Sequence, residues 1–368
     1  MNKLKILMII IGTWVISINL SAEDFCVTTS QELYTALFTA GVNNQSDHIK
    51  IKEGNYIAPV QKWQYLELVT ESFDLKITGG WTQFFDNPCG QNLRGSPLNT
   101  TLDGNMQGRV LNISPSTDTK IEISGISFNN GFLDQPGDNG GGVKIESDND
   151  LDHEVIIENC AFIGNNAFGV GGLLIRDTDK AVIRNNLFIL NTAVSGRIAM
   201  AIDGSNKYGF HITNNTFMFN EGGLQTQGSG TTQTFIANNI FWDNDEKAGT
   251  VDLSIVSTGT EYLYNNNIGL RSGGAEFSSG NISVEPTFET GILNFTPSIN
   301  SPMVGGGKNS PFVVPIPTPF NLAWSIGATD FEGNPRRQGD EIDIGAVESP
   351  HQMYVEIPIF KNGFESPE

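Results

Sequence analysis

Three ionisable residues occupy equivalent positions in three similar segments, where they could do chemistry together. Glu146 follows GGVKI, Arg176 follows GGLLI, and Asp203 follows RIAMAI. If these segments stack as neighbouring strands, the two carboxyl groups lie two strand spacings apart, roughly their separation in inverting glycoside hydrolases. A polysaccharide lyase would instead use a basic residue, here Arg176, to abstract the proton beside a uronate. The segments thus predict a row of Glu146, Arg176 and Asp203, with Gln227 in the next segment.

The same row has a simpler interpretation, which we favour. Alternating charges on neighbouring strands form a ladder of surface ion pairs that adds solubility and little stability. A slip of one residue in the alignment would also turn these side chains to the other face of the sheet. The row alone therefore does not establish catalysis.

Two further groups could bind ligands. The loop SDNDLDH contains Asp148, Asp150 and Asp152, which could bind Ca²⁺, but it lacks the glycine and terminal glutamate of an EF-hand loop. We favour a solvated acidic loop and expect no cofactor, with Ca²⁺ as the alternative. Trp242, one residue after Phe241, is the aromatic residue best placed to stack on a sugar ring; the alternative is a partly covered aromatic near a turn. The four histidines have no metal-ligand spacing.

A repeated element must position these residues, and the sequence contains one. ITNNTFMFN, from Ile212, recurs as IRNNLFILN from Ile183 and as IANNIFWDN from Ile236. An apolar anchor recurs at intervals of 24 to 34 residues, at Phe128, Phe162, Phe188, Phe217, Phe241 and Ile268. In five units an asparagine precedes the anchor by three residues: Asn159, Asn185, Asn214, Asn238 and Asn265.

This repeat predicts an all-β fold, a right-handed parallel β-helix (solenoid). The segments are rich in Ile, Val, Phe and Thr, which favour strands, and Asn tolerates the left-handed backbone of a turn. We expect the apolar column to fill the core. We expect the Asn column to lie in a turn, where stacked amides bond to one another and to the backbone. A leucine-rich repeat would need denser leucine, and a propeller would need blades of about 40 residues.

The ends of the stack and the domain boundaries can also be predicted. TTSQELYTALFTAG, from Thr28, is typical of an amphipathic helix with Thr29 and Glu32 at capping-box spacing and Gly41 at its end. Such a helix would cover an otherwise open sheet edge. We divide the chain into a signal peptide (1–22), a cap with the first coils (23–100), regular coils (101–290), irregular C-terminal coils (291–349) and a tail (350–368).

Charge and the N-terminal segment predict an exported protein that does not bind nucleic acid. MNKLK precedes an apolar run that ends at Leu20, which is typical of a signal peptide cleaved after Ala22. No later segment has the roughly 18 consecutive apolar residues of a membrane span. Loss of Lys3 and Lys5 would change the formal charge from −20 to −22. So acidic a chain excludes a nucleic-acid partner and is compatible with solubility, cation binding or a neutral glycan ligand.

The cysteines allow more than one arrangement. There are three, Cys26, Cys89 and Cys160, and an odd number in an exported chain indicates one pair with one thiol left over, or an intermolecular bond. We predict a Cys26–Cys89 disulfide with Cys160 as a buried free thiol. The alternative is that all three are reduced.

The C-terminal part resembles a known family. NSPMVGGG from Asn300, followed by GATDFEGNPRRQGDEIDIGAVE from Gly327, is similar to the choice-of-anchor Q domain of bacterial surface proteins. The matching residues are Asp330, Gly333, Asn334, Pro335, Arg336, Asp343, Ile344, Gly345, Ala346 and Glu348. The resemblance implies a right-handed parallel β-helix, secreted or displayed on a bacterial cell surface, often without known enzymatic activity. It favours a salt-bridged closing motif over catalysis for Asp330, Arg336 and Asp343, since the family has mixed functions.

Three functions follow as hypotheses. The first is a non-catalytic, adhesin-like scaffold that binds a polysaccharide or a cell-surface glycan. The second is a polysaccharide lyase or glycoside hydrolase acting on an acidic polysaccharide. The third is a structural stalk. We favour the first because no convincing catalytic cluster stands out. The tail after Glu348 lacks a sortase motif and a hydrophobic anchor, so surface attachment and release both remain open.

Overall fold

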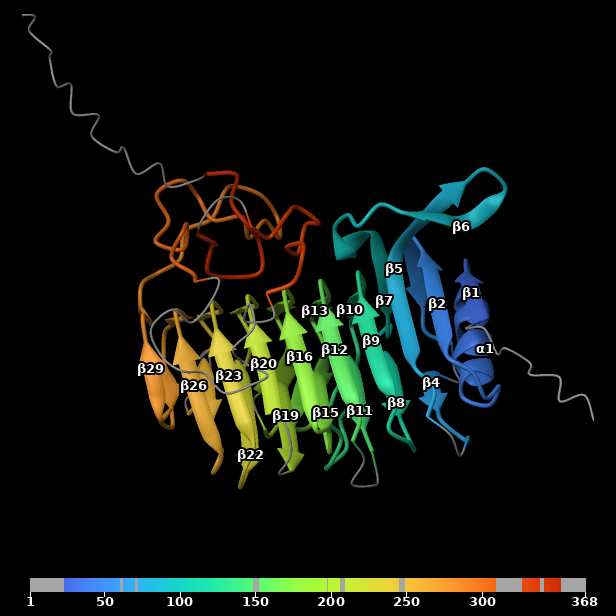
Figure 1. Cartoon of the computed structure of the whole chain (residues 1–368), viewed down its shortest axis with the longest axis horizontal. Helices are drawn as coiled ribbons and strands as arrows, with labels where there is room; N and C mark the ends of the chain where they lie inside the picture. The colour runs from blue at the N-terminus through green and yellow to red at the C-terminus, as the bar shows by residue number, and fades with distance from the viewer. Residues whose placement is uncertain are drawn as a thin grey trace, which may run out of the picture.

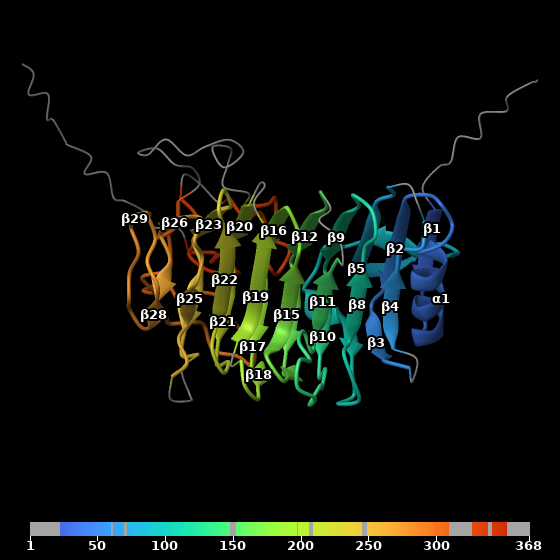
Figure 2. The same ribbon diagram turned by 90° about the horizontal axis from the view of Figure 1, so that it is seen from below.

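The computed structural model describes residues 23–59, 62–69, 72–147, 152–196, 198–205, 209–244, 249–308, 326–337 and 341–351. The predicted signal peptide and most of the predicted tail lie outside them. The described chain winds through three long sheets, so that each coil contributes one short strand to each sheet (Figures 1 and 2). This is the all-β parallel β-helix, with an N-terminal helix, that the sequence predicts.

The first sheet has 11 strands, all parallel except the last one named. They are β1 (Glu23–Val27), β2 (Asp47–Lys52), β5 (Leu75–Phe84), β9 (Lys120–Ser124), β12 (Glu154–Glu158), β16 (Lys180–Arg184), β20 (Gly209–Thr213), β23 (Gln233–Ala237), β26 (Thr260–Tyr264), β29 (Phe277–Ser279) and the antiparallel β6 (Asn87–Asn92).

The second and third sheets have eight strands each. The second contains β3 (Gly54–Ile57), β7 (Thr100–Asp103), β10 (Ser127–Asn129), β13 (Ala161–Ile163), β17 (Leu187–Ile189), β21 (Thr216–Met218), β24 (Ile240–Trp242) and β27 (Asn267–Ile268). The third contains β4 (Trp63–Leu66), β8 (Leu111–Ser114), β11 (Val143–Glu146), β15 (Val170–Arg176), β19 (Ile198–Ser205), β22 (Leu224–Ser229), β25 (Leu253–Ile255) and β28 (Arg271–Ser272). The described chain also contains a small strand pair, β14 (Asn166–Ala167) and β18 (Thr192–Ala193), and a 3-10 turn, η1 (Pro97–Asn99).

The apolar column lies in the core, as predicted. Each anchor pairs in register with the anchor of the next coil, from Phe128 to Ile268. The five phenylalanine rings stack, with centroid separations of 5.3, 4.6, 4.3 and 5.1 Å. Parallel strands in register place identical rings one strand spacing apart, which makes this stacking possible.

The predicted asparagine ladder was assigned to the wrong asparagine of each pair. Side-chain amides do stack, but the bonded column is the second residue of the pair, as in the Asn215 Nδ2 donation to Asn239 Oδ1 at 3.0 Å. The column runs through Asn186, Asn215, Asn239, Asn266 and Asn281. A parallel column runs through Asn165, Asn191, Asn220, Asn244 and Asp252.

The asparagines named in the prediction have a different role. Asn159, Asn185, Asn214, Asn238 and Asn265 adopt left-handed backbone conformations, with φ between 51° and 58°. Their amide groups donate outward to carbonyl oxygens of residues beyond 300, for example Asn185 Nδ2 to Ile326 O at 2.9 Å and Asn265 Nδ2 to Gly306 O at 3.2 Å. Among these five residues, the only side-chain hydrogen bond joins Asn238 Nδ2 to Asn214 Oδ1, at 3.5 Å. The first asparagine of each pair therefore binds the C-terminal segment, and the second one binds the neighbouring coils.

The C-terminal segment, which we define as residues 300–308, 326–337 and 341–349, packs along the outside of the coils rather than continuing the stack (Figure 1, orange to red). Its apolar side chains Met303, Phe331 and Ile344 join a second buried cluster with Leu187 and Ile240 of the second sheet. The sequence predicted irregular coils for 291–349; the described C-terminal segment is instead an external strap, and we use that name for it below.

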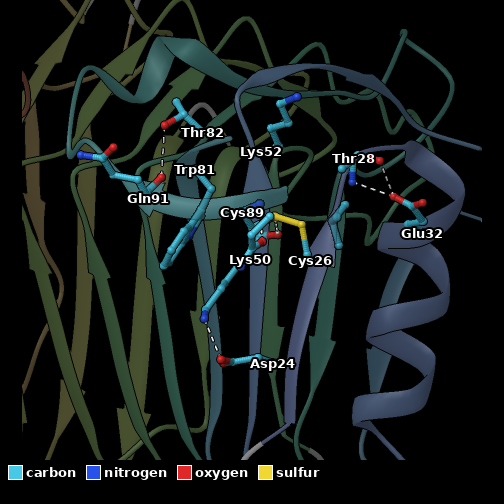
Figure 3. Close-up of a disulfide and its surroundings, with 12 residues drawn as sticks. Asp24, Cys26, Thr28, Glu32, Lys50, Lys52, Trp81, Thr82, Cys89 and Gln91 are labelled. Carbon is cyan, nitrogen blue, oxygen red and sulfur yellow. Dashed lines mark hydrogen bonds and ion pairs between the residues drawn. A yellow bond between two sulfur atoms is a disulfide. The ribbon is translucent and has the colours of Figure 1, made fainter. Parts of the chain in front are cut away.

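The N-terminal cap is confirmed. Helix α1 (Ser30–Ala40) begins with a capping box between Thr29 and Glu32 and ends at Gly41. It buries Leu33 and Leu37 against the first coil. The Cys26–Cys89 disulfide joins β1 to β6 next to this helix (Figure 3). Cys160 is free and buried, and burial raises the pKa of its thiol to about 12, so it remains protonated.

One carboxyl group inside the solenoid gives a testable pH dependence. Glu261 is 2% exposed and pairs in register with Thr234, in the inward-facing row that contains Phe210. Burial raises the pKa of Glu261 from 4.5 to about 7. Between these values the folded chain keeps a proton that the unfolded chain releases, so stability falls as pH rises through this window.

We expect Glu261→Gln to remove about 2–3 kcal/mol of this pH dependence. Urea unfolding of both proteins at pH 5 and pH 8 measures it. The wild type should lose more stability than the variant between the two pH values. Equal losses in the two proteins would show that Glu261 is not the responsible group.

Candidate functional site

The predicted charged row exists and faces outward on the third sheet. Glu146 pairs in register with Arg176, Arg176 with Asp203, and Asp203 with Gln227. Arg176 lies between the two carboxylates, with Nη1 2.7 Å from Glu146 Oε1 and Nε 3.9 Å from Asp203 Oδ2. Lys144 also pairs with Glu146.

The electrostatics of this row suit an ion-pair ladder better than an acid–base pair. Although burial opposes the shift, Lys144 and Arg176 lower the pKa of Glu146, which keeps it ionised. Burial raises the pKa of Asp203, and Arg176 opposes that rise. An inverting hydrolase leaves room for a water molecule between its carboxyl groups, whereas here a guanidinium occupies that position.

The structure also bears on the acidic loop and on Trp242, the other two predicted ligand-binding groups. Asp148 and Asp150 lie outside the described residues, and the Asp152 backbone N–H donates to Asp118 at 2.8 Å. Among the described residues, no group of three His, Cys, Asp or Glu side chains could hold a metal ion. Trp242 is half-buried against the second apolar cluster, so the structure matches the alternative of a partly covered aromatic.

The C-terminal signature residues form a closed, buried network. Arg336 is fully buried and donates from Nη1 to Glu348 Oε2 at 2.9 Å, and from Nη2 to Asn185 Oδ1 at 2.8 Å and Ala346 O at 2.7 Å. Asp330 accepts from the Glu348 N–H, and Asp343 accepts from the Ser349 N–H. Burial raises the pKa of Asp343. Because these side chains are buried and already hydrogen-bonded to one another and to the backbone, they hold the strap together and are not accessible to a ligand.

A cleft of about 360 Å³ lies on the outer face of the first sheet, and the sequence analysis did not predict it. Its floor is formed by Lys76 and Thr78–Trp81 of β5, by the ends of β9 and β12, and by the turns that follow β9 and β12. One side comes from the hairpin of β5 and β6, and the other from the C-terminal segment, which rise on the same side of the stack (Figure 1). It is lined by His48, Lys76, Thr78, Gly79, Gly80, Trp81, Asn92, Arg94, Gly95, Ser124, Gly125, Glu158, Asn159, Arg184, Ala328 and Thr329.

Glycine in place of asparagine opens the floor of this cleft. Gly79, within β5, and Gly125, in the turn after β9, stand where later coils have the outward-donating asparagine. A Cβ at Gly79 would collide with the Gly125 carbonyl oxygen, so the two coils pack backbone against backbone at this position. The first outward-donating asparagine is Asn159, whose amide binds Thr329 Oγ1 at 3.1 Å. Along the described stack, the asparagine contacts to the strap therefore start at the first coil that has asparagine instead of glycine at this position.

The two sides of the cleft touch each other. Gly333 of the strap packs so closely on Arg94 that an added Cβ would collide with the Arg94 carbonyl oxygen, and its φ is 87°. On the hairpin side, Asn92 donates to the Gly79 carbonyl at 2.9 Å and accepts from the Arg94 N–H at 2.8 Å. The cleft is therefore held in shape by contacts between the N-terminal coils and the C-terminal segment.

One aromatic ring is held in the cleft by hydrogen bonds. Trp81 Nε1 donates to Thr78 Oγ1 at 2.7 Å, and the same hydroxyl lies 2.7 Å from His48 Nε2. The His48 ring meets Trp81 edge-on at 5.7 Å. Lys50 lies over the indole at 4.8 Å and pairs with Asp24 at 2.7 Å (Figure 3). Burial of the ring and, secondly, the positive charge of Lys50 lower the pKa of His48 to about 4, so the ring is neutral at pH 7.

Sequence reasoning missed the cleft because its residues come from both ends of the chain. One signal was present: the ITGGW segment, Ile77 to Trp81, has two glycines where later repeats have paired asparagines.

A scan of protein-family models, a search of curated proteins and a search of solved structures each return no match for this chain. Within the described residues, no helix combines the length and apolar character needed to cross a membrane.

Proposed function

We propose that this chain is an exported, non-catalytic β-helix protein that binds a glycan in the cleft on the first sheet. The observation that carries the proposal is a polar cleft in which hydrogen bonds hold one aromatic ring. Small-molecule sites are concave and combine an apolar surface with a few placed polar groups. Trp81 offers an apolar face to a pyranose ring, while Ser124, Asn159 and Thr329 offer hydrogen-bonding groups along the same cleft.

Two features support export and surface display. A disulfide between Cys26 and Cys89 is typical of proteins that leave the reducing cytoplasm. The N-terminal segment resembles a signal peptide, and the resemblance of the C-terminal signature to the choice-of-anchor Q domain favours a bacterial surface or secreted protein.

Glycan-array screening of the mature chain, followed by calorimetric titration with the best oligosaccharide, tests the proposal. We expect Trp81→Ala to weaken binding at least tenfold, about 1.4 kcal/mol, because the ring that faces the sugar is lost. Trp81→Phe keeps an aromatic face and should retain part of the affinity. Arg176→Ala, on the third sheet, should bind like the wild type.

Three outcomes would contradict the proposal. A folded Trp81→Ala protein with wild-type affinity would exclude the cleft. Depolymerisation of a polysaccharide by the wild type, lost in Arg176→Ala, would make the charged row catalytic. An absence of both binding and cleavage across the array would favour a structural stalk.

A further inference from the structure

The charge of the cleft differs from that of the chain as a whole. The protein carries a formal net charge of −20. Yet three cationic side chains line the cleft, Lys76, Arg94 and Arg184, against one carboxylate, Glu158. His48 adds no charge, because its pKa lies near 4. The overall acidity had suggested a cation or a neutral glycan as ligand, whereas the local balance favours an anion.

The three cations differ in how far they are already neutralised. Arg184 binds Glu158 through Nε and Nη2, both at 2.6 Å. Lys76 pairs with Glu122 at 3.0 Å. In the part of the chain that the structure describes, no carboxylate lies within ion-pair distance of the exposed Arg94 guanidinium. Among the described residues, the cleft is thus lined by one guanidinium, that of Arg94, with no carboxylate paired to it.

The backbone of Arg94 is fixed although its side chain is exposed. Its φ is 47°, its N–H donates to Asn92 Oδ1 at 2.8 Å, and its carbonyl packs against Gly333. Asn92 and Trp81 are partners in the β5–β6 ladder, so the same hairpin positions the backbone of Arg94 and the indole of Trp81. An anchored backbone reduces the entropy lost when the guanidinium binds a ligand.

Resting on the proposed glycan-binding function, we propose that the cleft selects sugars that carry an anionic group, with Arg94 as the residue that binds this group. A guanidinium forms paired hydrogen bonds with a carboxylate or a sulfate, which gives both energy and orientation. Arg94 binds the anionic substituent while Trp81 packs on the ring, and the Arg184–Glu158 pair offers hydrogen bonds to hydroxyl groups. Uronic acids and sulfated sugars share this chemistry.

Matched ligand pairs test the inference with the mature chain. The probes are oligomers of galacturonate, mannuronate and glucuronate with their methyl esters, and sulfated galactan oligomers with their desulfated forms. We expect at least one acidic probe to bind at least tenfold more tightly than its neutral partner at low salt, and this preference to shrink as salt is added. The uronate and sulfate arms show which anionic group is preferred.

Arg94→Gln should remove most of that preference, so that the affinity for the acidic probe falls towards the affinity for its neutral partner. Arg94→Lys, which keeps the charge without the planar fork, should retain part of it. Arg271→Gln is the matched control, since it removes an equal charge from the exposed edge strand β28 of the third sheet.

The outcomes separate this inference from the proposed function. Equal affinity for acidic and neutral partners, with binding still lost in Trp81→Ala, overturns the anion preference and leaves glycan binding intact. An acid preference that persists in Arg94→Gln overturns the role of Arg94. Absence of binding to every glycan overturns both.

Discussion

Replacing Arg336 by methionine is expected to destabilise the protein by about 3–5 kcal/mol, because it leaves Glu348 as a buried, uncompensated carboxylate. Glu348 is 4% exposed, and its ion-pair partner Arg336 is completely buried. The change also removes the donors to Asn185 and to the carbonyls of Gly345 and Ala346. Urea unfolding, with hydrogen exchange to locate the loss, measures the effect.

Two controls make this prediction specific. Arg337, the next residue, is exposed, so Arg337→Met should cost less than about 1 kcal/mol. Adding Glu348→Gln to Arg336→Met removes the unpaired charge and should recover part of the loss. Exchange protection should fall first in the C-terminal segment. An Arg336→Met protein as stable as the Arg337→Met protein would show that the network does not hold the strap.

Phe217→Ala is expected to cost about 3–5 kcal/mol, because truncating a buried aromatic leaves a cavity that a stacked column cannot easily collapse. Phe217 is completely buried, between Phe188 at 4.3 Å and Phe241 at 5.1 Å. The free energy of unfolding from denaturant titration measures this cost.

The matched control is Phe84→Ala on the β5–β6 hairpin, where the ring is 51% exposed. It makes the same chemical change and should cost less than about 1 kcal/mol. Similar effects of the two substitutions would mean that the phenylalanine column does not form the core.

The solenoid could be predicted from sequence because its core is a local pattern repeated in each coil. Strands of period two and an apolar anchor at a fixed offset from a turn specify which side chains point inward, and register then stacks the anchors. The helix with its capping box and the register of Glu146, Arg176 and Asp203 were predictable because they depend on short-range chemistry or on the repeat itself. The Cys26–Cys89 disulfide spans 63 residues and was predictable only by elimination, because the third cysteine, Cys160, lies inside the repeat.

The asparagine assignment failed because two adjacent residues of the same type are indistinguishable in sequence. Their roles are set by one backbone angle: the left-handed conformation at Asn214 points its amide outward, and Asn215 then points inward to Asn239. The cleft was not predicted from the sequence, for a different reason. It depends on where residues near 330 meet residues near 94, a contact that no repeat encodes.

A crystal structure of the mature chain with an acidic oligosaccharide from the binding assays tests the central claim most directly. The account predicts a sugar ring against Trp81, with its carboxylate or sulfate at the Arg94 guanidinium, between the β5–β6 hairpin and the strap. A sugar bound instead along the row of Glu146, Arg176 and Asp203, or against Trp242, would contradict it.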